Sequence, residues 1–123
     1  MKKELTKEWK QLHADTMAFL KNLSSETVVL DAKVSCKTIL CIRDKKEGRT
    51  IAYRIAAYNN RGVFYLDRKN ERCLVEWKKV REWNLFSFIE DVFTENDEAI
   101  FLWQKYSELQ DATRKGFETY IEE

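Results

Sequence analysis

The chain has 123 residues, a mass of 14.8 kDa and a formal net charge of +1, and 44% of its residues are hydrophobic. This length suits one domain with its own core and is too short for two domains of ordinary size. The sequence has no apolar stretch long enough to cross a membrane, and no hydrophobic segment follows the N-terminal lysines as a secretion signal would require. Its three cysteines are an odd number, which argues against a disulfide framework. We therefore expect one soluble, cytoplasmic domain over residues 1–123.

The first expected element is a helix over residues 2–23, where apolar side chains recur at spacings of three and four. The following sequence is rich in β-branched and aromatic residues, which predicts strands over 27–35, 38–43, 50–58, 63–66 and 73–77. Short polar segments with asparagine or glycine suit hairpin turns between them. These strands should form an antiparallel meander.

Two further helices are expected at the C-terminal end. Residues 83–94 form a short segment rich in aromatic side chains, and the acids that follow it suit the start of a longer helix that could reach Tyr120. The expected fold class is therefore α+β. It consists of an N-terminal helix, an antiparallel meander of four to five strands, and a short and a long C-terminal helix packing on the sheet.

The turn lengths also suggest strand registers, in which Leu66 pairs with Cys73, and Asn59 pairs with Val63 across a bulge at Gly62. With these registers both faces of the sheet are largely apolar, and both need cover from helices, from curling of the sheet or from a second subunit. The C-terminal helices add aromatic surface, from Phe86, Phe88, Phe93, Phe101 and Trp103. A homodimer is therefore expected.

Glu76 and Lys78 have the Glu-x-Lys spacing found in metal-dependent nucleases of the restriction-endonuclease type, where a second carboxylate completes the Mg²⁺ site. The nearest upstream acid on the adjacent strand is Asp67. In the expected hairpin Asp67 lies opposite Arg72 and Glu76 lies opposite Val63, roughly 13 Å away at the strand rise, which is too far for one cation. We interpret the triplet as an ordinary strand with charged side chains outward, so a metal-dependent nuclease is the function that the sequence favours least.

Other catalytic sites find no support in the sequence. His13 is the only histidine and lies beside the apolar stripe of the first helix. Cys36 and Cys41 would point to opposite faces of one strand, so they do not form a zinc site with Cys73 and His13. A cysteine nucleophile would lack a histidine partner, and no glycine-rich phosphate loop is present. We expect a protein that is not an enzyme and has no metal or cofactor.

Charge is distributed unevenly along the chain. Residues 33–81 contain fourteen lysines and arginines against five acids, a net charge of +9. Residues 82–123 contain three basic residues against eleven acids, a net charge of −8. Such asymmetry creates a directional field and is typical of binding proteins, although opposite charges can also neutralise one another within a fold.

The function that the sequence favours first is that of a small non-catalytic interaction protein, of regulator or inhibitor type, that docks on a protein partner which itself handles nucleic acid. Acidic side chains on the C-terminal helices would imitate a row of phosphates and compete for a basic groove. The candidates are Asp97, Glu98, Glu108, Asp111, Glu118, Glu122 and Glu123. An origin in a phage or a mobile element would be compatible with this function.

The alternative is a module that binds nucleic acid directly through the basic ends of the sheet, with strand aromatics as stacking surfaces. One end of the expected meander gathers Lys37, Arg61, Lys78, Lys79 and Arg81. At the other end, two neighbouring hairpin tips would bring together Lys45, Lys46, Arg49, Arg68, Lys69 and Arg72.

Overall fold

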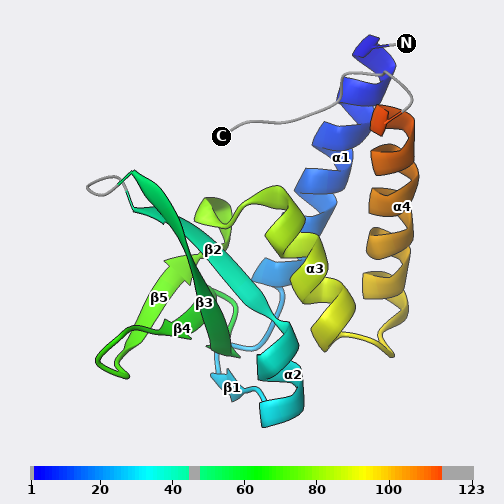
Figure 1. Cartoon of the computed structure of the whole chain (residues 1–123). Helices are drawn as coiled ribbons and strands as arrows, with labels where there is room; N and C mark the ends of the chain where they lie inside the picture. The colour runs from blue at the N-terminus through cyan, green and yellow to red at the C-terminus, as the bar shows by residue number, and fades with distance from the viewer. Residues whose placement is uncertain (1, 45–47, 115–123) are drawn as a thin grey trace.

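The computed structural model describes the backbone of residues 2–44 and 48–114 and the side chains of residues 6–38, 40 and 48–114. The helices and strands follow one another as α1 (Lys2–Lys21), β1 (Val28–Val29), α2 (Ala32–Lys37), β2 (Ile39–Asp44), β3 (Arg49–Tyr58), β4 (Gly62–Leu66), β5 (Arg72–Glu76), the 3₁₀ turn η1 (Trp77–Lys79), α3 (Glu82–Val92) and α4 (Asp97–Arg114) (Figure 1). The predicted α+β class, with an N-terminal helix, an antiparallel sheet and two C-terminal helices, is confirmed.

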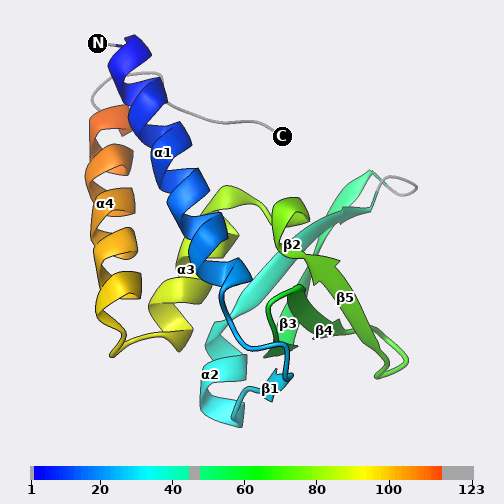
Figure 2. The ribbon, with the colours of Figure 1, turned by 180° about the vertical axis from the view of Figure 1, so that it is seen from behind.

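Helix α1 buries the apolar stripe that the sequence predicts. Trp9, Leu12, Phe19 and Leu20 are buried, and so is Thr16, whose hydroxyl donates a hydrogen bond of 2.7 Å to the Leu12 carbonyl. This bond satisfies a polar group that water cannot reach. The stripe holds α1 against α4, and the two helices lie side by side in both ribbon views (Figures 1 and 2).

The predicted strand over residues 27–35 is wrong beyond its first residues, because β1 contains only Val28 and Val29 and the short helix α2 follows it. The carboxylate of Asp31 accepts a hydrogen bond from the Val34 amide (3.0 Å), which caps the start of α2. At the other end the Thr38 hydroxyl donates to the Val34 carbonyl (3.0 Å). These local side-chain bonds outweigh the strand preference of the neighbouring valines.

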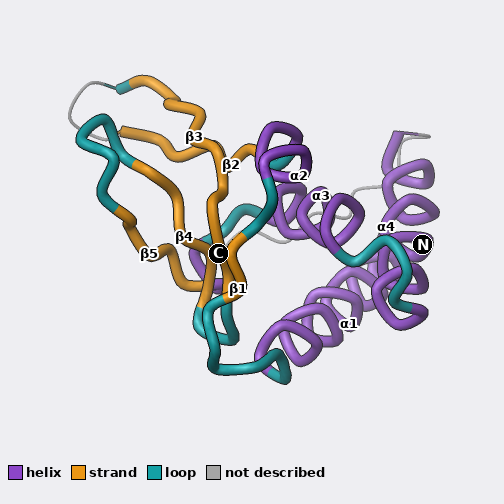
Figure 3. The backbone as a smooth tube through the Cα atoms, turned by 90° about the horizontal axis from the view of Figure 1, so that it is seen from below, coloured by secondary structure: helices purple, strands orange, loops and turns teal. Residues whose placement is uncertain are grey.

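Strand β3 is the centre of the sheet. Its residues 49–54 pair with β2, its residues 57 and 58 pair with both β1 and β4, and a bulge interrupts the pairing with β4 between Ile55 and Ala57. All pairs are antiparallel, and β4 pairs in turn with β5. The result is a curled meander with all the helices on one side of the strands (Figure 3).

Both predicted hairpin registers are wrong by one residue, since Leu66 pairs with Arg72 and Val63 pairs with Tyr58. The loop after β4 explains the first difference. The Asp67 carboxylate accepts hydrogen bonds from the amides of Lys69 (2.8 Å) and Glu71 (2.9 Å), and this folds the loop one residue tighter than its length suggests.

The register decides which side chains the helices cover. Leu40, Ile55 and Val63 lie in the core, and Tyr58, Tyr65 and Val75 pack against it. The opposite face of the sheet carries, from three neighbouring strands, Arg54, Phe64, Leu66, Arg72 and Leu74. Because a slip of one residue exchanges the faces of a strand, the side chains of β5 lie on the opposite faces from those expected. One face is core, and the other mixes apolar and basic side chains.

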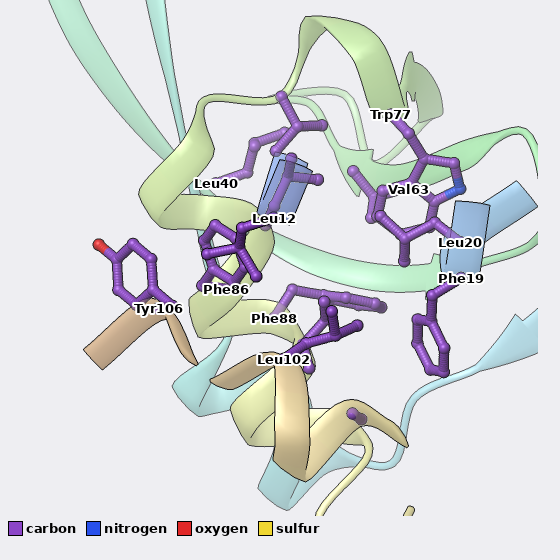
Figure 4. Packing of buried hydrophobic residues seen from close by; sticks show 14 of the residues in the cluster. Leu12, Phe19, Leu20, Leu40, Val63, Trp77, Phe86, Phe88, Leu102 and Tyr106 are labelled. Atoms are coloured by element: carbon purple, nitrogen blue, oxygen red, sulfur yellow. The ribbon is translucent and has the colours of Figure 1, made fainter. Parts of the chain in front are cut away.

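Helix α3 lies between the sheet and the other long helices. Phe88 packs on Trp77 and Tyr58, with ring centroids 5.2 and 5.3 Å apart, while Phe86 stacks on Tyr106 of α4 at 4.2 Å (Figure 4). Phe86 and Phe88 are therefore fully used inside the monomer. They supply no surface for the expected homodimer, and α4 lies against α1 and α3 as an outer layer.

Candidate protein-docking surface on the C-terminal helices

Helix α4 begins with a side-chain cap and an acidic first turn. The Asn96 carbonyl oxygen of the side chain accepts a hydrogen bond from the Ala99 amide (3.0 Å), and Asp97 and Glu98 lie where the helix dipole is positive. The inner side of the helix is buried, through Ala99, Leu102, Tyr106 and Leu109. This inner stripe fixes which side of α4 faces solvent.

The side of α4 opposite this inner stripe carries Asp97, Phe101, Glu108 and Asp111, all of them exposed. We call these four residues the acidic stripe. From Asp97 to Asp111 the stripe runs for roughly 21 Å, at a rise of 1.5 Å per residue. Phe101 is 61% exposed, so the row of carboxylates has a large apolar group inside it.

Two of the carboxylates in the stripe have cationic neighbours on the same helix. Glu108 lies 4.0 Å from the ammonium group of Lys105, and Asp111 lies 4.0 Å from the guanidinium group of Arg114. Both pairs are exposed to solvent, so each contributes well under ~1 kcal/mol to stability. They reduce the net charge of the C-terminal half of the stripe without occupying its carboxylates permanently.

A shallow apolar depression lies beside the stripe, between the end of α3 and the start of α4. Its volume is about 240 Å³. Its lining consists of apolar side chains with two polar ones at the edge, namely Ile89, Glu90, Phe93, Thr94, Ala99, Ile100 and Trp103. Ile100 is 37% exposed at its rim, so the depression continues the apolar surface of Phe101.

Two further acids stand at the end of α3 next to this depression. Burial, and then the negative charge of Asp91, raise the pKa of Glu90 above its usual value. Burial also raises the pKa of Asp91, and the cation of Lys37 partly offsets this effect. Both carboxylates are thus less favourably ionised than they are in water, and a cation that docked beside them would stabilise their charged forms.

Of the acids predicted to form a site, Asp97, Glu108 and Asp111 share the acidic stripe, and Glu98 is exposed beside it. Glu118, Glu122 and Glu123 lie outside the described residues. The sequence did not indicate the depression or the place of Phe101 among the acids. The helical spacing of Asp97, Phe101 and Glu108 could have shown that Phe101 lies among the acids on one side of the helix.

The first group of predicted basic residues is only partly brought together. The Trp77 amide donates a hydrogen bond of 3.3 Å to the Arg61 carbonyl, which places Arg61 next to Lys78 and Lys79 in η1. Arg81 directly precedes α3. Lys37 instead ends α2, which packs against α3, and its charge acts on Asp91.

The second basic group does not form one cluster. Arg49 stands at the start of β3, six residues before the pairing of Ile55 with Tyr65, and that distance is roughly 20 Å along the strand. The loop with Arg68 and Lys69 follows β4 just beyond this pairing, and Arg72 begins β5. The paired ends of β2 and β3 at Asp44 and Arg49 and the loop between β4 and β5 lie at different corners of the molecule (Figures 1 and 2). Lys45 and Lys46 lie outside the described residues.

The Glu-x-Lys triplet forms an exposed ion pair, because the ammonium group of Lys78 lies 3.8 Å from the Glu76 carboxylate. Glu76 pairs with Gly62 at one end of the β4–β5 hairpin. Beyond the other end, the Asp67 amide donates a hydrogen bond of 3.0 Å to the Glu71 carbonyl. Asp67 and Glu76 are therefore at opposite ends of β4 and β5. Within the described residues, no group of three or more His, Cys, Asp or Glu side chains lies close enough to hold a metal ion.

The comparisons with known proteins place this chain in no family. No family model, no curated protein and no solved structure matches it. Among the described residues, no helix is both long and apolar enough to cross a membrane. The case for a function therefore rests on the surfaces described above.

Proposed function

We propose that this chain is a small non-catalytic interaction protein that docks through the C-terminal helices on a basic protein partner, one whose own ligand is nucleic acid. The observation that carries the proposal is the acidic stripe with Phe101 inside it, beside an apolar depression. This surface combines carboxylates on one face of a helix with an aromatic ring that is strongly exposed.

The spacing of the carboxylates supports mimicry of a phosphate row. Asp97 and Glu108 are separated by about three turns of helix, or roughly 17 Å, and Asp111 follows one turn later. A groove that holds several phosphates of a nucleic acid strand presents arginine and lysine side chains over a similar distance. Such a groove would meet the stripe with opposite charge, and electrostatic attraction would speed the encounter.

The apolar part of the surface would supply affinity at the centre of the contact. Aromatic side chains that are desolvated at the middle of an interface commonly contribute most of the binding energy, while charges at the rim tune rate and specificity. Phe101 and Ile100 would be the apolar side chains that lose their water at the middle of this contact. The depression between α3 and α4 could accept one apolar side chain of the partner, with Glu90 at its edge.

The proposal predicts what a charge reversal does. The variant Asp97→Lys, Glu108→Lys and Asp111→Lys should lose at least about tenfold of its affinity for partners that the natural chain captures from a cell lysate, because three attractive contacts become repulsive. The natural chain should retain proteins that bind nucleic acid, and added duplex DNA should displace them. Pull-down with identification by mass spectrometry measures both effects.

A matched control separates the stripe from overall charge. The variant Glu8→Lys, Asp15→Lys and Glu26→Lys makes the same change in net charge at exposed positions of α1 and the following loop. It should capture the same partners as the natural chain. Equal capture by the stripe variant, or partners that DNA does not displace, would contradict the proposal.

A second candidate function is direct binding of nucleic acid at Arg61, Lys78 and Lys79. The observation in its favour is the backbone bond that brings Arg61 to η1. Gel-shift titration of single- and double-stranded oligonucleotides should then show log affinity falling with log salt by about 0.7 to 0.9 per phosphate contacted. Arg61→Ala should lower this slope by about one contact, whereas Lys33→Ala on α2 should not. The absence of a shift at low salt would remove this candidate.

A further inference from the structure

The outer face of the sheet is a second surface, and none of the helices within residues 2–44 and 48–114 covers it (Figure 3). Leu66 pairs with Arg72 and Phe64 pairs with Leu74, while Arg54 directly precedes Ile55, whose pairing with Tyr65 is the last between β3 and β4. Both arginines are exposed, and Leu66 is 40% exposed. The three apolar side chains of this face are absent from the hydrophobic core. We call these five residues the outer sheet patch.

The pattern of this patch is the reverse of the acidic stripe. In the patch, Leu66 pairs with Arg72, and Arg54 lies on β3 on the other side of β4. In the stripe, Phe101 lies between the carboxylates of Asp97 and Glu108. The patch therefore has an apolar centre with positive charges beside it, and the stripe has an apolar centre with negative charges beside it. Arginine and carboxylate are the pair that forms the strongest charge-assisted hydrogen bonds.

We infer that the occupant of the outer sheet patch is the acidic stripe of a second copy of this chain. The alternative of two patches packed on one another would place Arg54 and Arg72 of one copy against those of the other. Like charges in a buried contact are costly, so a symmetric contact between patches is disfavoured. The chain itself carries the complementary surface. The charges of residues 33–81 (+9) and 82–123 (−8) nearly cancel, so an assembly of two copies has little net charge.

The positions of the two surfaces make this association head-to-tail. The patch lies on the side of the sheet away from the helices, and α4 lies beyond α1 and α3 on the far side of the molecule (Figures 1 and 3). One copy cannot bring its own patch and stripe together. A contact between different surfaces continues from copy to copy, and it closes only into a ring. Each such contact also covers a stripe, so self-association would compete with the partner of the proposed function.

Single substitutions at the two apolar centres test the inference on the purified chain. At low salt, light scattering should give the natural chain a mass that rises above 14.8 kDa with concentration. Phe101→Lys places a cation against the arginines of the patch, and Leu66→Glu places an acid against the carboxylates of the stripe. Both positions are exposed, so both variants should fold, which circular dichroism checks. Each variant alone should stay at 14.8 kDa.

The equimolar mixture of the two variants is the decisive sample. Phe101→Lys keeps an intact patch and Leu66→Glu keeps an intact stripe, so the mixture should again show at least twice the monomer mass. Ala18→Lys and Ala14→Glu on the exposed side of α1 make the same charge changes and should associate as the natural chain does. A natural chain that remains monomeric at every concentration would overturn the inference. So would a mixture that stays monomeric, which is the result expected for a symmetric dimer.

This test and that of the proposed function can fail separately. The inference uses the stripe named there but requires no foreign partner, and light scattering of the pure chain reports on it alone. Leu66→Glu should prevent self-association and leave partner capture intact. Phe101→Lys should impair both. Loss of capture in Leu66→Glu would show that the patch contributes to the partner site, which would contradict the assignment of the patch to a second copy.

Discussion

The variant Gly62→Ala should be the least stable single substitution in this protein. A Cβ atom on Gly62 would lie 2.0 Å from the carbonyl oxygen of Val75 and 2.9 Å from the Cα atom of Glu76. Both are backbone atoms of β5, so no rotation of a side chain relieves the contact, and the pairing of β4 with β5 must open. We expect a loss of about 3 to 5 kcal/mol in the free energy of unfolding, measured by urea denaturation followed by circular dichroism.

Gly48→Ala is the matched control for this prediction. Gly48 has a φ of +68°, where a Cβ atom is strained, but no atom lies within 4 Å of the position that the Cβ would occupy. The expected loss is therefore only that of the left-handed backbone, roughly 1 kcal/mol. If both variants unfolded at the same urea concentration, the close approach of β4 to β5 at Gly62 would not have the effect that we assign to it.

Trp77→Ala should have the second largest effect. The Trp77 ring is 2% exposed, its indole N–H donates to the Asn59 carbonyl (3.0 Å), and it packs on Phe88. The substitution removes a large buried side chain from the junction of sheet and α3, which commonly costs about 3 to 5 kcal/mol. That is a large part of the total stability of a small domain. The urea midpoint, compared with that of the natural chain, measures the loss.

Trp77→Phe separates packing from hydrogen bonding at the same position. A phenyl ring keeps most of the contact with Phe88 but leaves the Asn59 carbonyl without its indole donor. The expected loss is about 1 to 3 kcal/mol, the cost of one buried acceptor without a partner. If the alanine and phenylalanine variants were equally unstable, the hydrogen bond would be the dominant contribution and the packing argument would be wrong.

The fold separates charges that the chain already separates by segment. The basic segment contains β2 to β5, and the acidic segment contains α3, which packs on the sheet, and α4, which lies beyond it (Figure 1). Within the fold, the positive charge of Lys37 partly offsets the effect of burial on the pKa of Asp91. Glu108 and Asp111 of the stripe pair with cations of their own helix, but these pairs are exposed to solvent, as are Asp97 and both arginines of the patch.

The sequence by itself determined helices α1 and α3 and the start of α4, because a helix buries the same side along its whole length. The three-and-four spacing that includes Trp9, Leu12 and Leu20 defines α1, because a helix buries one stripe regardless of what packs on it. The same holds for α3 and for the start of α4, whose acidic first turn is a local signal. The predicted acids Asp97, Glu108 and Asp111 share one stripe for the same reason.

Other features depend on residues that are distant in the sequence or on a few hydrogen bonds in loops. Only the tertiary structure decided these features. The Asp31 cap turned a predicted strand into α2, and the hydrogen bonds of Asp67 shortened a hairpin by one residue. That single residue exchanged the faces of β5, placed Val75 toward the core and left Arg72 beside Leu66 outside. When both faces of a strand carry apolar residues, the alternation in its sequence does not show which face is buried. Only the packed helices show which face becomes the core.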